Sequence, residues 1–187
     1  MNLTEPSLHR RSIRLPGYDY SQPGAYFVTM VTHGHRCLFG RVEEGEMVLN
    51  TLGRVASAQW HQLPYRFADL ELGEWVIMPN HIHGILVITG KGEASSDKLL
   101  RPQSESIKDA SPLRPNGTIP GSVGAIIQNF KSVTSRKINS QLSKAKEPLW
   151  HRNYYEHVIR NEQDLQTITD YIMTNPLNWE KDEEYSG

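Results

Sequence analysis

Two histidines separated by a single residue are the sharpest chemical feature of this sequence. His81 and His83 lie in a run that reads Met-Pro-Asn-His-Ile-His-Gly. On a β-strand, side chains two residues apart point to the same face, so both imidazoles could bind one cation. Such a pair needs at least one further ligand, usually an oxygen when the ion is Mg²⁺ or Mn²⁺. On spacing alone, two half-buried histidines packed on a sheet remain the simpler interpretation.

A tyrosine and an asparagine near the C-terminal end form a second candidate. Tyr171 and Asn175 are four residues apart in a segment, 162–175, that is predicted to be a helix. Their spacing places them on one strip of the helix, beside its apolar stripe and at the seam with a sheet. The tyrosine could simply pack its ring there. Alternatively, Tyr171 is a nucleophile beside a metal, and the Asn175 amide oxygen supplies a third ligand.

A competing histidine pair, His33 and His35, lies close to Cys37. Gly34 between the two offers no packing partner on the reverse face, and the first predicted strand ends here. We therefore expect a loop. The alternative is a site for a soft metal formed by the two histidines and the thiol.

The elements that must position these residues alternate between strands and helices. The hydrophobic pattern predicts strands over 26–32, 70–78 and 81–88 and a short strand within 150–159. The segments 41–43 and 46–49 are expected to form either a short hairpin or a surface loop. It predicts helices over 52–63, from Ser122 onward, and over 162–175. Strands 70–78 and 81–88 are expected to pair across Pro79-Asn80. The order predicts an α+β domain in which helices cover one face of a mainly antiparallel sheet.

Length and composition set the boundaries of this domain. A chain of 187 residues has room for one domain, which we place at 25–179. A basic arm, 1–24, precedes it, and an acidic tail without regular structure, 180–187, follows it. Within the domain, 90–121 is rich in Ser, Lys, Pro, Asn and Gly and is expected to be a flexible insertion.

The composition also excludes several classes of protein. Hydrophobic residues make up 37% and charged residues 22%, and the mean hydropathy is −0.54, which excludes collagen, coiled coil and wholesale disorder. The single cysteine excludes an intrachain disulfide and a four-thiolate zinc site. No apolar run is long enough to span a membrane. We therefore expect a cytoplasmic protein with no membrane association.

The net charge of −1 conceals a segregation of charge along the chain. Residues 101–160 carry ten Lys or Arg against four acids, whereas 161–187 carry one Lys against seven acids. Such asymmetry permits a basic face that binds a polyanion. The alternative is that these clusters are ordinary solvated surface.

Three motifs together resemble a known family. They are His81-Ile82-His83 in its setting, the run from Trp150 to Asn161, and the run from Asp170 to Pro176. In this order they resemble the single-tyrosine HUH transposases, and most of all the REP-associated tyrosine transposases, over about residues 14 to 179. The resemblance implies a ferredoxin-like (RRM-like) α+β fold. It implies cleavage and rejoining of single-stranded DNA near a hairpin through a 5′-phosphotyrosine intermediate.

The resemblance also implies roles for particular residues. His81 and His83 would bind Mg²⁺ or Mn²⁺, Tyr171 would be the nucleophile, and Asn175 would complete an uncharged metal site. The partner would be single-stranded DNA with a hairpin, and a homodimer is one of two open oligomeric states. Two alternatives stay open: a hydrolase or nucleotidyl transferase with a histidine nucleophile, and an inactive hairpin-binding module. Phosphate contacts are expected from Arg10, Arg11, Arg14, Lys131, Arg136, Lys137, Arg152 and Arg160.

Overall fold

A four-stranded antiparallel sheet forms the centre of the molecule. The computed structural model describes residues 18–90, 118–142, 148–182 and 184–185. The sheet has the order β4-β5-β1-β6, and each neighbouring pair of strands is antiparallel. Its strands are β1 (Gly24–Val31), β4 (Leu70–Ile77), β5 (His81–Ile88) and β6 (Tyr155–Ile159). The predicted α+β fold with an antiparallel sheet is confirmed.

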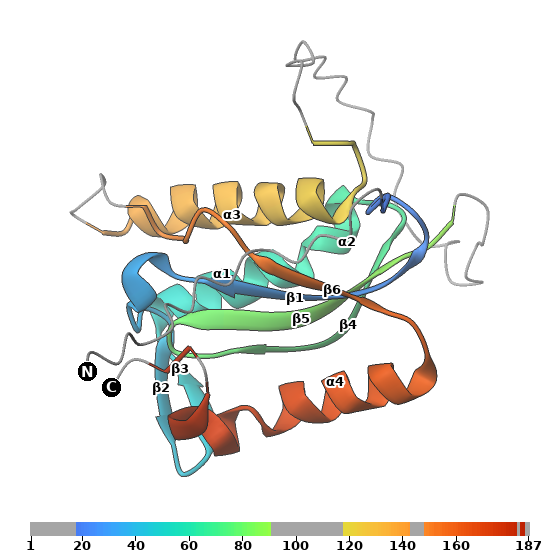
Figure 1. The fold of residues 1–187 in the computed structure, drawn as a ribbon. Coiled ribbons are helices and arrows are strands. Elements are labelled where there is room, and N and C mark those ends of the chain that lie inside the picture. Colours follow the sequence, from blue (N-terminus) through green and yellow to red (C-terminus); the bar gives the residue numbers. More distant parts are fainter. Residues whose placement is uncertain (1–17, 91–117, 143–147, 183, 186–187) are drawn as a thin grey trace, which may run out of the picture.

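Helices cover both faces of this sheet (Figure 1). On one face lie α1 (Thr51–His61), the short α2 (Leu63–Arg66) and α3 (Val123–Asn139), and on the other lies α4 (Glu162–Thr174). All helices were expected on one face of the sheet, and α4 departs from that expectation. The reason is that the central strands are apolar in both directions.

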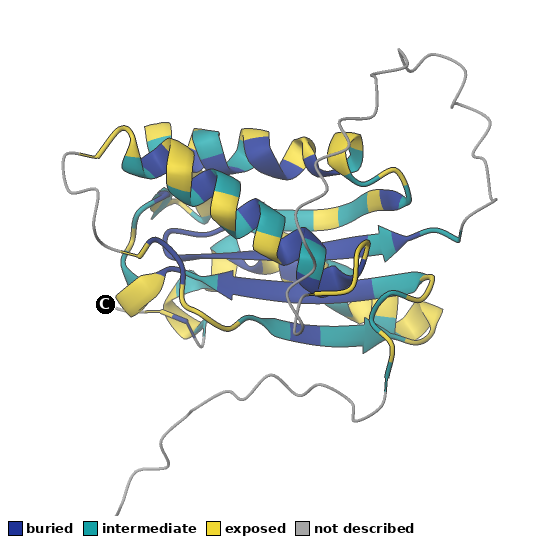
Figure 2. Ribbon diagram, turned by 90° about the horizontal axis from the view of Figure 1, so that it is seen from above, coloured by how far each residue is buried: buried dark blue, intermediate teal, exposed yellow. Residues whose placement is uncertain are grey.

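Alternate residues of β1 show this two-sided character. Tyr26 and Val28 point into the larger core beneath α1 and α3, whereas Phe27 points into a second core with Ile85 and Ile172. Figure 2 shows the central strands buried between helices whose outer surfaces are exposed. A sheet that is apolar on both faces needs a cover on each.

The glycine that follows the histidine pair permits close packing of α1. A Cβ atom at Gly84 would lie 2.4 Å from Cζ2 of Trp60, a fully buried side chain in the larger core. The Trp60 ring therefore rests directly on the backbone of β5. This contact is on the face of β5 opposite to the two histidines.

The remaining segments are short. β2 (Gly40–Glu43) and β3 (Glu46–Leu49) form a hairpin, one of the two alternatives expected there, and it is separate from the main sheet. The residues His33–His35 form an exposed 3-10 turn, so the loop interpretation of that pair is confirmed. A second 3-10 segment, η3 (Pro176–Lys181), follows α4. Of the described helices, none combines the length and the hydropathy that crossing a membrane requires.

Candidate metal centre and nucleophile

His81 and His83 lie at the start of β5, on the sheet face that α4 covers. Both are buried, with exposed fractions of 0% and 1%. Between them, Ile82 points the other way into the larger core. The alternation expected from the sequence therefore places the two rings side by side, with centroids 4.4 Å apart.

The hydrogen bonds around His81 determine which of its nitrogens carries the proton. The Asn80 amide nitrogen donates to the carbonyls of Glu184 (2.6 Å) and His35 (3.3 Å), so Asn80 Oδ1 is an acceptor. It lies 2.8 Å from His81 Nδ1, which must donate to it. The proton is then on Nδ1, and the lone pair of Nε2 is left for another partner. His81 Nε2 is buried and has no hydrogen-bond partner among the described residues.

His83 is held in a similar way from the neighbouring strand. Thr29 is its register partner on β1, and Thr29 Oγ1 lies 2.8 Å from His83 Nδ1. The ring stacks on Phe27, with centroids 5.5 Å apart. These contacts turn His83 Nε2 toward α4, where it lies 3.2 Å from the hydroxyl of Tyr171.

A carboxylate that the sequence analysis did not identify completes the cluster. Asp182 lies 4.0 Å from His81 Nε2 and 3.9 Å from His83 Nε2, and one ligand atom from each of the three residues lies within 4.8 Å of the others. Two atoms bound to one Mg²⁺ at roughly 2.1 Å lie at most about 4.2 Å apart. Small side-chain movements would therefore bring all three onto one ion. The pocket was expected to be uncharged. Instead, Asp182 gives it one carboxylate.

Asn175 also belongs to this cluster. Its amide nitrogen donates to Asp182 Oδ2 at 2.7 Å, and its Oδ1 is buried without a hydrogen-bond partner. A nitrogen lone pair, an amide oxygen and a carboxylate thus converge in a buried space. Such acceptors satisfy one another only through a proton or a cation, and this donor set suits a divalent ion.

The pKa shifts agree with this arrangement. Burial, followed by the neighbouring His83, lowers the pKa of His81 well below its usual range, so the ring stays neutral and can bind a metal. Burial by itself would raise the pKa of Asp182. The contacts with His83, His81 and the Asn175 amide outweigh this effect and hold the pKa well below its ordinary value.

The helix α4 brings Tyr171 to the histidines. Asn161 accepts a hydrogen bond from the Asp164 amide and caps the helix, while Ile172 buries in the second core. Tyr171 lies beside this apolar contact, 44% exposed, and its hydroxyl donates to Asp182 Oδ2 at 3.2 Å. The tyrosine and all the candidate ligands come from one chain.

The described part of the tail packs against this centre. Trp179 of η3 packs on the His81 ring, with centroids 5.8 Å apart, and Glu184 is buried. The acidic composition of 180–187 signalled solvent exposure, which is why Asp182 was missed. The one sequence signal for Asp182 was its spacing of seven residues from Asn175, which on a helix would place both on one face. Pro176 interrupts the helical pattern between them.

The predicted DNA-binding cations that the structure describes lie outside the cluster around Tyr171. The residues Arg10, Arg11 and Arg14 are outside the described part of the chain. Arg136, Lys137, Arg152 and Arg160 are exposed, whereas the Lys131 amine donates to the carbonyls of His151 and Asn153. Arg160 follows β6 at the end of the sheet opposite to His81.

No family model matches the chain. An uncharacterized protein of Haemophilus influenzae is 40% identical over 181 residues, which cover 95% of this chain and 93% of that protein. The chain belongs to the family of this protein.

Among solved structures, the chain is similar to a REP-associated tyrosine transposase bound to a REP hairpin. The TM-score is 0.53 at 17% sequence identity, and the likeness covers 87% of this chain and 72% of that chain. The chain therefore has the fold of this transposase. The relationship that the three motifs predicted is confirmed at the level of the fold.

Proposed function

We propose that this protein is a metal-dependent, single-stranded DNA transposase or endonuclease that cleaves and rejoins DNA at hairpin-forming sequences. The observation that carries the proposal is the 3.2 Å contact between the Tyr171 hydroxyl and His83 Nε2, beside the buried cluster of His81, His83 and Asp182. The hairpin substrate is supported by the fold, because the similar transposase binds a REP hairpin.

The proposed reaction is a transesterification at phosphorus. Tyr171 Oη attacks the scissile phosphate, the new O–P bond forms, and the P–O3′ bond breaks, leaving a 5′-phosphotyrosine and a free 3′-hydroxyl. The phenol loses its proton and the departing O3′ gains one, so the step balances, while Asp182 Oδ2 accepts the hydrogen bond that orients the hydroxyl. The reverse step uses a 3′-hydroxyl to rejoin the strand.

His81, His83 and Asp182 would hold Mg²⁺ or Mn²⁺, with the Asn175 amide oxygen as a fourth donor. A phenol with a pKa near 10 is a weak nucleophile at neutral pH. A bound divalent ion would supply the polarisation of the phosphate oxygens that this nucleophile requires. Because Tyr171 is partly exposed, a DNA strand can approach it from solvent.

A denaturing gel tests this proposal. DNA hairpins from the sequence flanking the gene, labelled at the 3′ end, are incubated with the protein and Mn²⁺. The label is placed there because a 5′-phosphotyrosine retains the downstream fragment. The wild type is expected to give a labelled protein band that EDTA abolishes, and Tyr171→Phe is expected to bind the hairpin without forming the band.

The alternatives give different results in this experiment. An enzyme with a histidine nucleophile would keep its activity in Tyr171→Phe. An inactive binding module would shift the hairpin in a native gel, but the wild type would form no covalent product under any metal condition.

A further inference from the structure

Three aromatic rings meet between the candidate metal centre and the second core. Phe27 stacks on the ring of His83, with centroids 5.5 Å apart and an interplanar angle of 25°. The ring of Tyr171 meets Phe27 edge to face, at 6.1 Å and 84°, and its centroid lies 5.1 Å from that of His83. Phe27 therefore touches both a candidate metal ligand and the candidate nucleophile.

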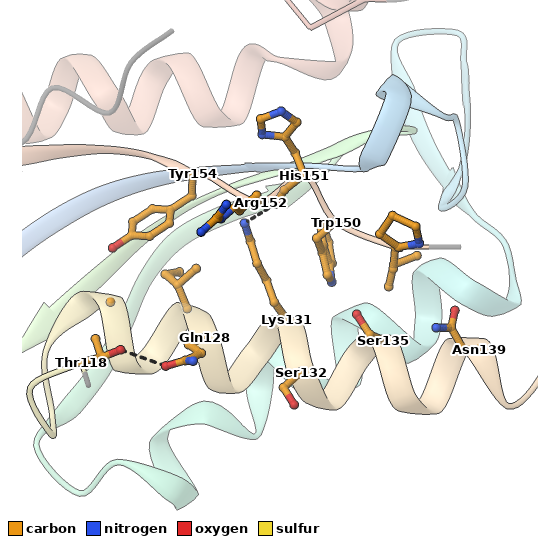
Figure 3. Close-up of a pocket in the computed structure, with 14 residues that line it drawn as sticks. Thr118, Gln128, Lys131, Ser132, Ser135, Asn139, Trp150, His151, Arg152 and Tyr154 are labelled. Carbon is orange, nitrogen blue, oxygen red and sulfur yellow. Dashed lines mark hydrogen bonds between the residues drawn. The ribbon is translucent and has the colours of Figure 1, made fainter. Parts of the chain in front are cut away.

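The position of Phe27 is fixed by its strand and by a fourth ring. Phe27 is 8% exposed and lies on β1 between its register partners Ile85 of β5 and His157 of β6. Tyr155 of β6 meets it edge to face at 6.2 Å. The preceding residue, Tyr154, belongs to the larger core on the other face of the sheet, and Figure 3 shows its ring in the groove beside α3. The alternation of side chains along the chain thus places one tyrosine ring against Phe27.

The phenol of Tyr171 shares its polar contacts with the candidate metal centre. Its hydroxyl makes hydrogen bonds with His83 Nε2 and Asp182 Oδ2, each at 3.2 Å. Both partners are candidate metal ligands, so a bound cation would compete for these two contacts. The ring contact with Phe27 is independent of that competition, because it uses no lone pair.

We propose that Phe27 is a positioning residue, which holds the Tyr171 ring beside His83 when the hydroxyl gives up its hydrogen bonds to the metal ligands. Aromatic pairs prefer edge-to-face or offset geometry at centroid separations of about 4.5–7 Å, so the contact favours one orientation of the phenol. A reacting group displaced by about 1 Å can lose about 100-fold in rate. The inference rests on the proposed function for the role of Tyr171, but the position of the ring is measured without DNA or metal.

A variant without the ring tests this inference. Phe27→Leu keeps an apolar side chain at the position, and Phe27→Met keeps a longer one. Ile85→Val is the matched control, because it removes one methyl group from the same small core and leaves the three rings in place. The Phe27 variant whose urea unfolding lies closer to that of the control is used in both measurements.

The first measurement is the solvent exposure of Tyr171, in EDTA and without DNA. The tyrosines are replaced by 3-fluorotyrosine, and the fluorine NMR signal of Tyr171 is assigned by its absence from Tyr171→Phe. The change in its chemical shift between water and heavy water reports the exposure of the fluorine and does not depend on the ring current of Phe27. Wild type and control are expected to give the same partial change, because Tyr171 is 44% exposed. The Phe27 variant is expected to give a larger change, close to that of free 3-fluorotyrosine.

The second measurement is the single-turnover rate of covalent product formation at saturating hairpin and Mn²⁺, where neither affinity limits the rate. The Phe27 variant is expected to be about 100-fold slower, with the hairpin affinity kept and the control like the wild type. A solvent-induced change equal to that of the wild type, or an unchanged rate despite a larger change, would overturn the inference. If the wild type formed no covalent product, the proposed function would fail, and the NMR result would still decide whether Phe27 holds the ring.

Discussion

At the scale of single residues, the site depends on two side chains that hold the histidine rings rather than on the histidines alone. Asn80 fixes the proton of His81, and Thr29 fixes the orientation of His83. Residues that orient metal-binding histidines typically change metal affinity by about 10- to 100-fold when they are replaced. Neither residue is distinctive by composition, and only the register of β1 against β5 shows the role of Thr29.

Thr29→Val tests this positioning. Valine has nearly the same shape, so the fold is expected to be kept, while the loss of the hydrogen bond to His83 Nδ1 frees the ring to rotate. The expected result is a fall of about 10- to 100-fold in Mn²⁺ affinity, measured by calorimetry. Thr167→Val, on the exposed side of α4, is the control and is expected to bind Mn²⁺ like the wild type. Equal affinities in the two variants would show that Thr29 does not orient the ligand.

At the scale of elements, the start of α4 determines where Tyr171 lies. Asp164 accepts hydrogen bonds from His157 Nε2 (2.9 Å) and from the Arg160 amide (3.2 Å), which attach the helix to β6. The hydrogen bond with His157 has the largest effect, and together these contacts lower the pKa of Asp164 below its ordinary value of 3.8. The aspartate therefore stabilises the fold in its charged form.

Asp164→Asn is expected to be less stable than the wild type, with a difference that depends on pH. Because the carboxyl pKa is lower in the folded protein than in the unfolded chain, the charged Asp164 contributes its full stability above the unfolded pKa of 3.8. This stability is lost as the pH falls through the pKa of the folded protein. Urea unfolding should show a constant gap between the two proteins from pH 5 to 7 and a narrowing gap below about pH 4. A gap that stays the same in acid would contradict a role for the charge.

The packing of α1 on β5 is tested by Gly84→Ala. The added Cβ would meet the ring of Trp60, a fully buried side chain, at 2.4 Å. Overpacking of this kind typically costs about 1–3 kcal/mol in the free energy of unfolding. Gly90→Ala is the control, since among the described residues its Cβ would meet only Pro23, at 3.5 Å. If the two variants unfold at the same urea concentration, the close contact with Trp60 is not the reason for a glycine at position 84.

The same elements show how far the sequence predicts the structure. Period-two spacing placed both histidines on one face, and the spacing of Tyr171 and Asn175 placed them together beside the sheet. The face of the sheet that α4 covers was not predicted, because an all-apolar strand does not show which side each helix will cover. Asp182 was not predicted because its place depends on how the chain turns after Pro176, which no local pattern encodes.

At the scale of the whole molecule, charges of opposite sign predominate on the two sides of the sheet. Several basic residues lie on or beside α3, and acidic residues lie on the α4 side. The basic group comprises Lys131, Arg136, Lys137 and Arg152, and the acidic group comprises Glu162, Asp164, Asp170 and Glu180. A polyanion is therefore expected to approach from the α3 side and to reach Tyr171 around the edge of the sheet.

Deletion of residues 1–14 tests the basic arm that precedes the domain. If Arg10, Arg11 and Arg14 each neutralise one phosphate of a single strand, their loss should reduce the slope of log affinity against log salt by about two. The measurement is hairpin binding over a salt series, with the wild type for comparison. An unchanged slope would place the arm outside the DNA interface.

The claim at the centre of this account is that one divalent cation joins the β5 histidines to the region of Tyr171. Crystals of the protein grown with Mn²⁺, measured at an X-ray energy where manganese scatters anomalously, test it directly. The account predicts a single anomalous peak at bonding distance from His81 Nε2, His83 Nε2 and an Asp182 oxygen, with the Tyr171 hydroxyl facing it. A protein that shows no peak between the two histidines at saturating Mn²⁺, or a peak bound only elsewhere, would contradict the account.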